Sequence, residues 1–437
     1  MAIIPQITLF EGIEYENLGD LERLKLVLNY MPDEELMRKL EEKRGNGRDD
    51  YPIRAMWNCL IAGIIFQHKG ESSLLRELGR NSQLRVITGF AGRKLPESYN
   101  YSRFLKNLLE CNEEIEKMFD TVLKEITELL PDFGQRLAGD GKAIQSFATG
   151  KNKNSEKDGR RDLDADKGVK KYSGVDENGK AWEKITTWFG YKLHLIVDAI
   201  YELPIAYEVT KASAGENPEM KKLIREVAKN NPEIMERCEV FTADRGYDDT
   251  EIITDLWDEH KVKAVIDIRN CWQDKDEIRM FENRQNIIGY DNFGTIYCYC
   301  PESGKRREMS FSGFEKDRES LKYTCPCKAY GVQCEGCKTC PYANKSVRIK
   351  MEEDPRRFTA IARSSHKWNR EYDIRTSVER VNSRIDNVYG FEKHYIRGKK
   401  KMKLRVGLSL LIMLVMALGR IKEKQPERMR SLVARVS

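Results

Sequence analysis

Residues 136–144 read Arg-Leu-Ala-Gly-Asp-Gly-Lys-Ala-Ile, an apolar stretch with an aspartate at position 140. We predict a β-strand here, with Asp140 inside it and a glycine on each side of the acid. Gly139 and Gly141 would allow a bulky neighbour to approach the backbone closely. A buried strand tolerates a charge only when the charge is paired or bound to a metal. Asp140 is therefore a candidate functional carboxylate, although a solvated aspartate would also fit the pattern.

A second aspartate, Asp244, ends the predicted strand 240–244 within the run Thr-Ala-Asp-Arg-Gly-Tyr-Asp. Strand patterns alternate with helical patterns along this part of the chain, which indicates an α/β sheet with parallel strand pairs. Functional groups in such sheets gather at the strand ends. The further expected strands are 187–197, 205–209 and 264–268, and the expected helices are 217–228 and 249–260.

A third acid, Glu379, stands in a stretch with helical character over residues 368–389. Tyr372, Arg375, Glu379 and Asp386 have the spacing that places side chains on one face of a helix. A helix face that carries a phenol, a guanidinium and a carboxylate is too polar to pack into the hydrophobic core. Either the face is solvated, or the helix lies along a phosphate path, with Glu379 on a metal and Arg375 on a phosphate.

Together these residues resemble the DDE transposases of bacterial insertion sequences. The resemblance is carried by Asp140, Asp244 and Glu379, and by the runs Leu-Ala-Gly-Asp-Gly-Lys (137–142), Gly-Tyr-Lys-Leu-His-Leu (190–195) and Thr-Ala-Asp-Arg-Gly-Tyr-Asp (242–248). It implies an α/β ribonuclease-H-like catalytic core that follows an all-helical amino-terminal domain. The gaps of 104 and 135 positions between successive acids leave room for an insertion before the last catalytic helix.

The resemblance also implies the site and its chemistry. Asp140, Asp244 and Glu379 would be both catalytic residues and ligands of two Mg²⁺ ions, with Mn²⁺ as a substitute. The enzyme would bind the terminal inverted repeats of its element, cleave DNA strands and transfer them to target DNA, as a homodimer on DNA. The family motif places a lysine where this chain has Asp386. The residues expected to contact DNA are Tyr372, Arg375, Arg384, Lys142, Arg245 and Arg397.

The charge distribution favours nucleic acid as the partner. The chain of 437 residues has a net charge of +6, yet residues 393–437 alone carry +11. Such a basic segment indicates a polyanion or an anionic membrane surface. The apolar run 406–418 is shorter than the roughly 20 residues of a spanning helix, so a buried core helix is the preferred interpretation. We expect no membrane association and, without a signal peptide, a cytoplasmic, nucleoid-associated bacterial protein.

A chain of 437 residues is too long for one compact core and suits two or three domains. We expect a helical DNA-binding domain over 1–130, a ribonuclease-H-like catalytic domain over 133–270 and 351–420, a cysteine-rich insertion over 271–350, and a basic tail over 421–437. Arginines near the joints of the first helices suit a helix-turn-helix reader, but also a plain helical domain. The polar stretch 149–180 is predicted to be a loop, and the insertion to have little core of its own.

Seven of the eleven cysteines fall between Cys298 and Cys340. Their Cys-x-Cys and Cys-x-x-Cys spacings predict a structural Zn²⁺ site, with reduced thiols as the alternative. A protein of another class would also fit the sequence: a zinc-containing DNA-binding protein derived from a transposase that has lost catalysis.

Overall fold

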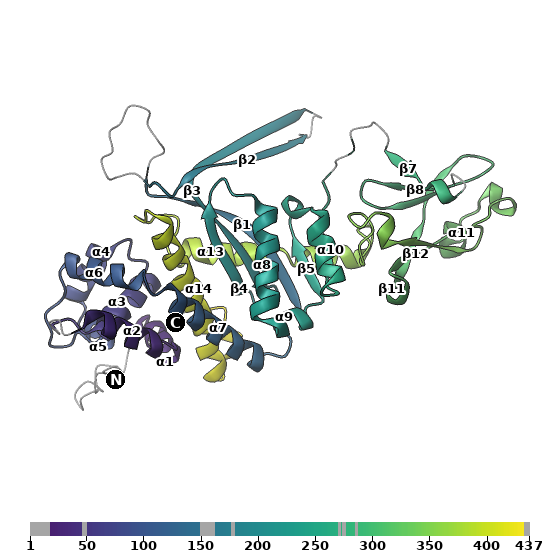
Figure 1. The fold of residues 1–437 in the computed structure, drawn as a ribbon. Helices are drawn as coiled ribbons and strands as arrows, with labels where there is room; N and C mark the ends of the chain where they lie inside the picture. Colours follow the sequence, from purple (N-terminus) through teal and green to yellow (C-terminus); the bar gives the residue numbers. More distant parts are fainter. Residues whose placement is uncertain are drawn as a thin grey trace.

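A computed structural model of the chain describes residues 18–45, 50–148, 162–175, 180–269, 272, 277–284 and 287–431 (Figure 1). The α-helices are α1 (Leu21–Tyr30), α2 (Glu34–Arg44), α3 (Ile53–Ile65), α4 (Glu71–Arg80), α5 (Ser82–Thr88), α6 (Ser98–Leu108), α7 (Asn112–Leu129), α8 (Glu216–Asn230), α9 (Pro232–Arg237), α10 (Thr250–Asp258), α11 (Pro326–Tyr330), α12 (His366–Asp373), α13 (Thr376–Asn387) and α14 (Lys399–Lys422). The 3₁₀ helices are η2 (Arg245–Tyr247), η3 (Glu282–Arg284), η4 (Lys316–Arg318), η5 (Glu335–Lys338), η6 (Met351–Glu353) and η7 (Pro426–Arg428).

The strands form three sheets in the described part of the chain. They are β1 (Arg136–Gln145), β2 (Asp166–Val175), β3 (Ala181–Asp198), β4 (Leu203–Lys211), β5 (Val240–Ala243), β6 (Lys263–Ile266), β7 (Ile278–Met280), β8 (Ile288–Asp291), β9 (Ile296–Tyr299), β10 (Arg306–Glu308), β11 (Ser310–Glu315), β12 (Ser320–Thr324) and β13 (Ser346–Lys350).

The central sheet is mixed. β1 pairs antiparallel with β3, which pairs antiparallel with β4, whereas β5 is parallel to β1 and β6 is parallel to β5. With its helices this sheet makes a mixed α/β core that is consistent with the ribonuclease-H-like expectation. The prediction that 149–180 is a loop is wrong for residues 166–175, which form β2 and pair with the first half of β3. The remaining positions of that stretch include 149–161 and 176–179, which lie outside the described residues.

Opposite faces of β1 meet different helices. A side chain added at Gly139 would touch Met220 of α8, whereas Asp140 is bonded to Asn382 of α13. Because successive residues of a strand point to opposite faces, α8 covers one face of β1 and α13 covers the other. The acid at position 140 therefore faces α13.

Only helices precede β1 in the described residues, and they share one continuous core with the central sheet. α14 contacts α1, α3, α7 and β4, and so joins the first helices to the sheet. Among the described helices, α14 is the one that is long and apolar enough to cross a membrane by length and composition. Its apolar window is 89% buried inside the protein, which is the environment of a core helix and agrees with the preferred interpretation of 406–418.

The segment between β6 and α12 contains two small sheets, β10-β9-β8-β7 and β11-β12-β13 (Figure 1). The expectation that it has little core of its own is wrong. A separate apolar cluster forms around Ile288, Ile296, Tyr323, Ile349 and Phe358. Its strands are three to six residues long and carry many polar residues, so their period-two pattern is hard to recognise in the sequence.

Candidate active site

Asp140 and Asp244 are neighbours because their strands are. In the parallel pair of β1 and β5, Gly139 lies opposite Ala243. Asp140 follows Gly139 in β1, and Asp244 follows Ala243 at the end of β5. The two aspartates therefore lie side by side at the carboxyl end of β5. The strand order, which the sequence pattern leaves open, thus brings the two acids together. Asp244 also caps η2, since its Oδ1 accepts a hydrogen bond of 2.7 Å from the Gly246 N–H.

Asp140 lies in a partly desolvated environment. Burial raises its pKa, and the nearby carboxylates of Asp244 and Glu216 raise it further, while the Gly141 N–H opposes the shift. Asn382 of α13 donates a hydrogen bond of 3.0 Å from Nδ2 to Asp140 Oδ2. Two acids that repel each other at a strand end form a site for a cation.

Glu379 is carried by α13, on the face of β1 toward which Asp140 points. It precedes Asn382 by three residues, which places the two side chains on the same side of the helix. The Glu379 side chain is 53% exposed, and its Oε1 accepts a hydrogen bond of 2.6 Å from Arg375 Nη1. Glu379 therefore lies on the side of α13 that carries Asn382, the partner of Asp140, but its carboxylate is bonded to Arg375 in this structure.

The single helix expected over 368–389 is divided in two, and this correction concerns the site. α12 ends at Asp373 and α13 begins at Thr376, so Tyr372 belongs to α12, whereas Arg375 is the N-cap of α13 and Glu379 lies in the first turn of α13. Arg375 still lies over the Tyr372 ring, with its guanidinium carbon 5.5 Å from the ring centre. Burial would lower the pKa of Arg375, but Glu379, together with Asp244, outweighs burial and raises it. Arg375 is thus bonded to Glu379 and lies within the electrostatic influence of Asp244.

In the described ranges, no group of three or more His, Cys, Asp or Glu side chains is arranged to hold a metal ion. The donor types nevertheless suit Mg²⁺, which prefers carboxylate oxygens. The side chain that would have to turn is Glu379, away from Arg375. The site residues thus fit a divalent ion by type and by position in the fold, but not by their present side-chain orientation.

A fourth acid, Glu216, was missed by sequence reasoning. It begins α8 and lies on the other face of β1, where a side chain added at Gly141 would come within 3.4 Å of it. Lys192 forms an ion pair of 3.2 Å with Glu216, and the buried Tyr247 hydroxyl lies nearby, close to Gly141. The sequence signal was an acid in the first turn of a helix, which is too common to single out one residue.

The expected DNA-contact residues differ in availability. Lys142 is paired with Asp386, the residue that stands at the position of the family's lysine. Arg384 is paired with the buried Glu202, and Arg245 contacts Asp267 at 2.8 Å but keeps a 64% exposed side chain. Arg397 lies beside Phe147 at the edge of a large cavity.

A family model described as "Transposase DDE domain" matches residues 164–416, more than half of the chain. The chain belongs to this DDE transposase family. Members of the family act on DNA in transposition and recombination, and generally use divalent metal ions. The matched region of the transposase contains Asp244 and Glu379, and it begins after Asp140.

A cryo-EM structure of a piggyBac transposase synaptic complex with hairpin DNA is similar to the transposase at 10% sequence identity. The similarity covers 96% of this chain and 80% of that chain with a TM-score of 0.38, a likeness too slight to support an argument. No curated protein sequence matches the chain.

The seven clustered cysteines of the transposase all line one small cavity between β9, α11 and η5. The Cys300 Sγ accepts hydrogen bonds from the N–H groups of Ser303 and Gly336, at 3.5 and 3.3 Å. Hydrogen bonding from the Ser303 side chain first, and then from backbone N–H groups that include those of Ser303 and Gly336, lowers the pKa of Cys300 to about 6. The thiols therefore line one cavity, but the described side chains form no group that could hold a metal ion, so the zinc site stays a prediction.

Proposed function

We propose that this transposase binds the ends of its insertion sequence and catalyses Mg²⁺-dependent DNA cleavage and strand transfer. Asp140, Asp244 and Glu379 would be its catalytic acids. The observation that carries the proposal is the placement of the two aspartates side by side on β1 and β5, beneath the helix that carries Glu379.

Glu379 is preferred to Glu216 as the third acid because of the face on which each lies. Asp140 points toward α13, which carries Glu379, whereas Glu216 lies on the α8 side of β1 and is already neutralised by Lys192. Side chains on one face of a sheet can reach a common ion more readily than side chains on opposite faces.

The three carboxylates would hold two Mg²⁺ ions, or Mn²⁺ as a substitute. When bound, such ions activate a water or a 3′-hydroxyl and stabilise the leaving oxygen of a phosphodiester. The protein contributes positioning: Asn382 fixes Asp140, and the Gly246 N–H fixes Asp244. Arg375 would leave Glu379 for a DNA phosphate, since a guanidinium suits both partners.

DNA would be held by the predicted contacts that remain accessible. Arg245 and Arg375 would exchange their present partners, Asp267 and Glu379, for DNA phosphates. Tyr372 lies beside Arg375, and Arg397 lines the cavity that contains Phe147. Lys142 and Arg384 are held in better shielded ion pairs and would contact DNA only after rearrangement. We further propose that the helical part before β1 contributes to recognition of the element ends in nucleoid DNA. A homodimer on DNA would bring two ends together.

The test uses a DNA fragment that carries the gene and its flanking genomic sequence. The purified transposase is expected to nick the fragment at the element ends with Mg²⁺ or Mn²⁺, and not with Ca²⁺. Binding at those ends without nicking under any metal would instead favour the other candidate, a catalytically inactive DNA-binding protein.

We also propose that the Cys298–Cys340 cluster binds a structural Zn²⁺. Support comes from seven thiols around one cavity and from hydrogen bonds that favour the thiolate of Cys300. Elemental analysis of the purified protein should find about one zinc per chain. Zinc-free protein with full thiol reactivity would contradict the proposal.

A further inference from the structure

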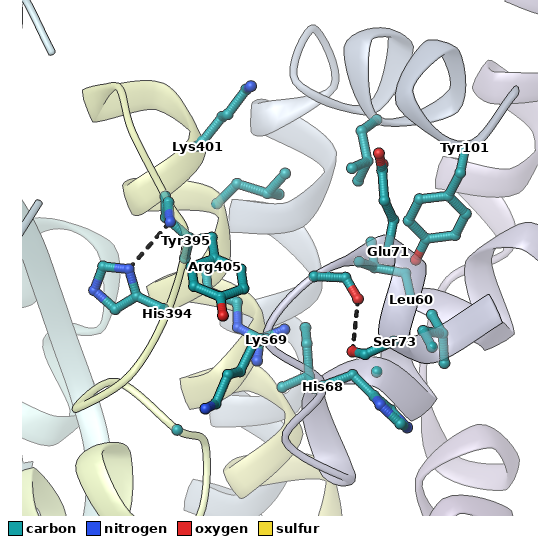
Figure 2. A pocket seen from close by; sticks show the side chains of 18 of the residues that line it. Leu60, His68, Lys69, Glu71, Ser73, Tyr101, His394, Tyr395, Lys401 and Arg405 are labelled. Carbon is teal, nitrogen blue, oxygen red and sulfur yellow. Dashed lines mark hydrogen bonds between the residues drawn. The ribbon is translucent and has the colours of Figure 1, made fainter. Parts of the chain in front are cut away.

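A cavity of about 1150 Å³ opens between the first helices and the segment 389–405, which leads into α14. Figure 2 shows Ser73 and Glu71 from the first helices on one side, Tyr395 and Arg405 from the carboxyl-terminal segment on the other, and Lys69 close to Tyr395 and Arg405. Small-molecule pockets span roughly 300–1,000 Å³. The cavity is larger than that range, and its size suits a segment of a polymer.

The cavity is strongly cationic. Glu71 is the one carboxylate among its described lining residues, and its oxygens accept hydrogen bonds from the hydroxyls of Ser98 and Ser102. Unlike many basic residues of this chain, the six cations of the cavity form no ion pair in the described part of the structure. These cations are Lys69, Arg76, Lys106, Arg397, Lys401 and Arg405.

Arg405 gives the clearest sign of an anionic ligand. Its side chain is half-buried in the wall of the cavity, and its hydrogen bond within the protein is a long one of 3.3 Å to the Tyr389 carbonyl. Burial lowers the pKa of Arg405 to about 10, so the group stays charged at neutral pH. A guanidinium that is shielded from water and has no carboxylate partner is unfavourable unless an anion binds to it.

A second buried polar group lines the same cavity. The Tyr101 side chain is 3% exposed, and its hydroxyl has no hydrogen-bond partner in the described structure. A phenol can donate a hydrogen bond to a phosphate oxygen. Arg405 and Tyr101 therefore both lack a partner that an anion would supply.

Aromatic rings are exposed at the mouth of the cavity. Phe147 and Tyr395 are 46% and 57% exposed, and their ring centres lie 4.7 Å apart. The guanidinium of Arg397 lies over the Phe147 ring at 5.0 Å. Exposed rings beside an arginine form a surface on which unpaired bases stack, whereas the bases of a duplex already stack on one another.

We propose that this cavity binds a DNA segment with unpaired bases, its phosphates near Arg405 and a base against Tyr395 and Phe147. This inference rests on the proposed function, because it assigns the DNA of that function a second contact surface away from the three acids. It concerns binding alone and needs no metal.

The test is a fluorescence anisotropy titration of the full chain, without divalent cations. Its probe is a mixed-sequence single-stranded DNA of about 16 nucleotides, compared with a duplex of the same sequence. Tyr395→Ala is expected to weaken single-strand binding about ten-fold and duplex binding much less. The matched control is Tyr330→Ala, at a 66% exposed tyrosine on α11 outside the cavity, which should change neither.

The phosphate contact is tested by salt dependence. Arg405→Gln should reduce the slope of log affinity against log salt by about one unit. Because Arg405 is half-buried and its variant could fold poorly, the same measurement is made with Lys401→Gln, at an exposed residue that also lines the cavity. Arg318→Gln, distant in the small sheets, should leave the slope unchanged.

The inference is overturned if Tyr395→Ala and Phe147→Ala both bind single-stranded DNA as tightly as Tyr330→Ala does. Cleavage needs metal and this titration has none, so the two proposals fail separately. If the unaltered protein does not nick DNA but its single-strand binding depends on Tyr395 and Phe147, the proposed function is contradicted. If it nicks DNA but its single-strand binding does not depend on these residues, this inference is contradicted.

Discussion

Asn382 donates a hydrogen bond of 3.0 Å to Asp140 and so connects α13 to the central strand β1. The bond fixes the carboxylate of Asp140 on the face where Glu379 lies. It also fixes the position of the helix whose preceding turn carries that glutamate. Asn382 is therefore a positioning residue of the proposed site.

Replacing Asn382 by alanine should affect both folding and cleavage. A hydrogen bond to a charged group is worth about 2 kcal/mol, so the free energy of unfolding in urea should fall by about that amount. The cleavage rate should fall while the affinity for DNA is kept. Ser383→Ala, at the exposed neighbouring position, is the control. Unchanged cleavage by Asn382→Ala would show that the bond does not position the site.

The ion pair between Lys142 and Asp386 should stabilise the contact of β1 with α13. Both side chains are largely shielded from solvent, so the coupling energy should reach about 1 kcal/mol, the upper end for exposed pairs. A double-mutant cycle with Lys142→Ala and Asp386→Ala, followed by urea denaturation, measures it. A coupling near zero would mean that the pair contributes nothing to stability.

The close packing at Gly139 predicts a cost for the smallest added side chain. A Cβ at this position would lie 2.8 Å from the Phe241 ring and 2.9 Å from the Met220 methyl group. Gly139→Ala should therefore lower the melting temperature, with a loss of about 1–3 kcal/mol. Gly79→Ala is the control: it lies on α4 with open space around it and should raise stability slightly. Equal stabilities would contradict the packing described.

Glu202 should make stability depend on pH. Burial would raise its pKa, but Arg380 and Arg384 outweigh burial and lower it; Arg430 also contacts the carboxylate. A carboxylate whose pKa is lowered by folding stabilises the fold at pH values above its ordinary pKa, which is about 4.3 for glutamate. This stabilisation is lost as the pH falls through the folded-state pKa.

Glu202→Gln should thus cost about 3 kcal/mol near neutral pH, and the difference from the native chain should shrink below about pH 4. Thermal denaturation across this range measures it, with the exposed Glu352→Gln as the control. A difference that stays constant down to acid pH would rule out the charge of Glu202 as the cause.

The parts of the fold that could be predicted are those in which local pattern and tertiary environment agree. β1 and β5 read as apolar strands that carry or end in an acid, so their positions follow from the sequence, whereas their parallel pairing is seen only in the structure. The close approach expected at Gly139 and Gly141 is present, to Phe241 and Tyr247 respectively.

The parts that could not be predicted lack such agreement. β2 is polar and stabilised by its pairing with β3, so its sequence resembles a loop. The break between α12 and α13 occurs without proline or glycine: Ile374 and Arg375 keep helical dihedral angles, which leaves no sequence signal. The location of Glu216 beside Gly141 depends on how α8 crosses the sheet, which no local pattern encodes.

The central claim is that Glu379, and not Glu216, completes the acidic site with Asp140 and Asp244. Its most direct test is Mg²⁺-dependent nicking of the fragment with the gene and its flanks, by Glu379→Gln and Glu216→Gln proteins shown to bind that fragment equally. Glu379→Gln should nick at least about 100-fold more slowly than the unaltered protein, while Glu216→Gln retains most activity. Normal nicking by Glu379→Gln, or loss confined to Glu216→Gln, would contradict the assignment.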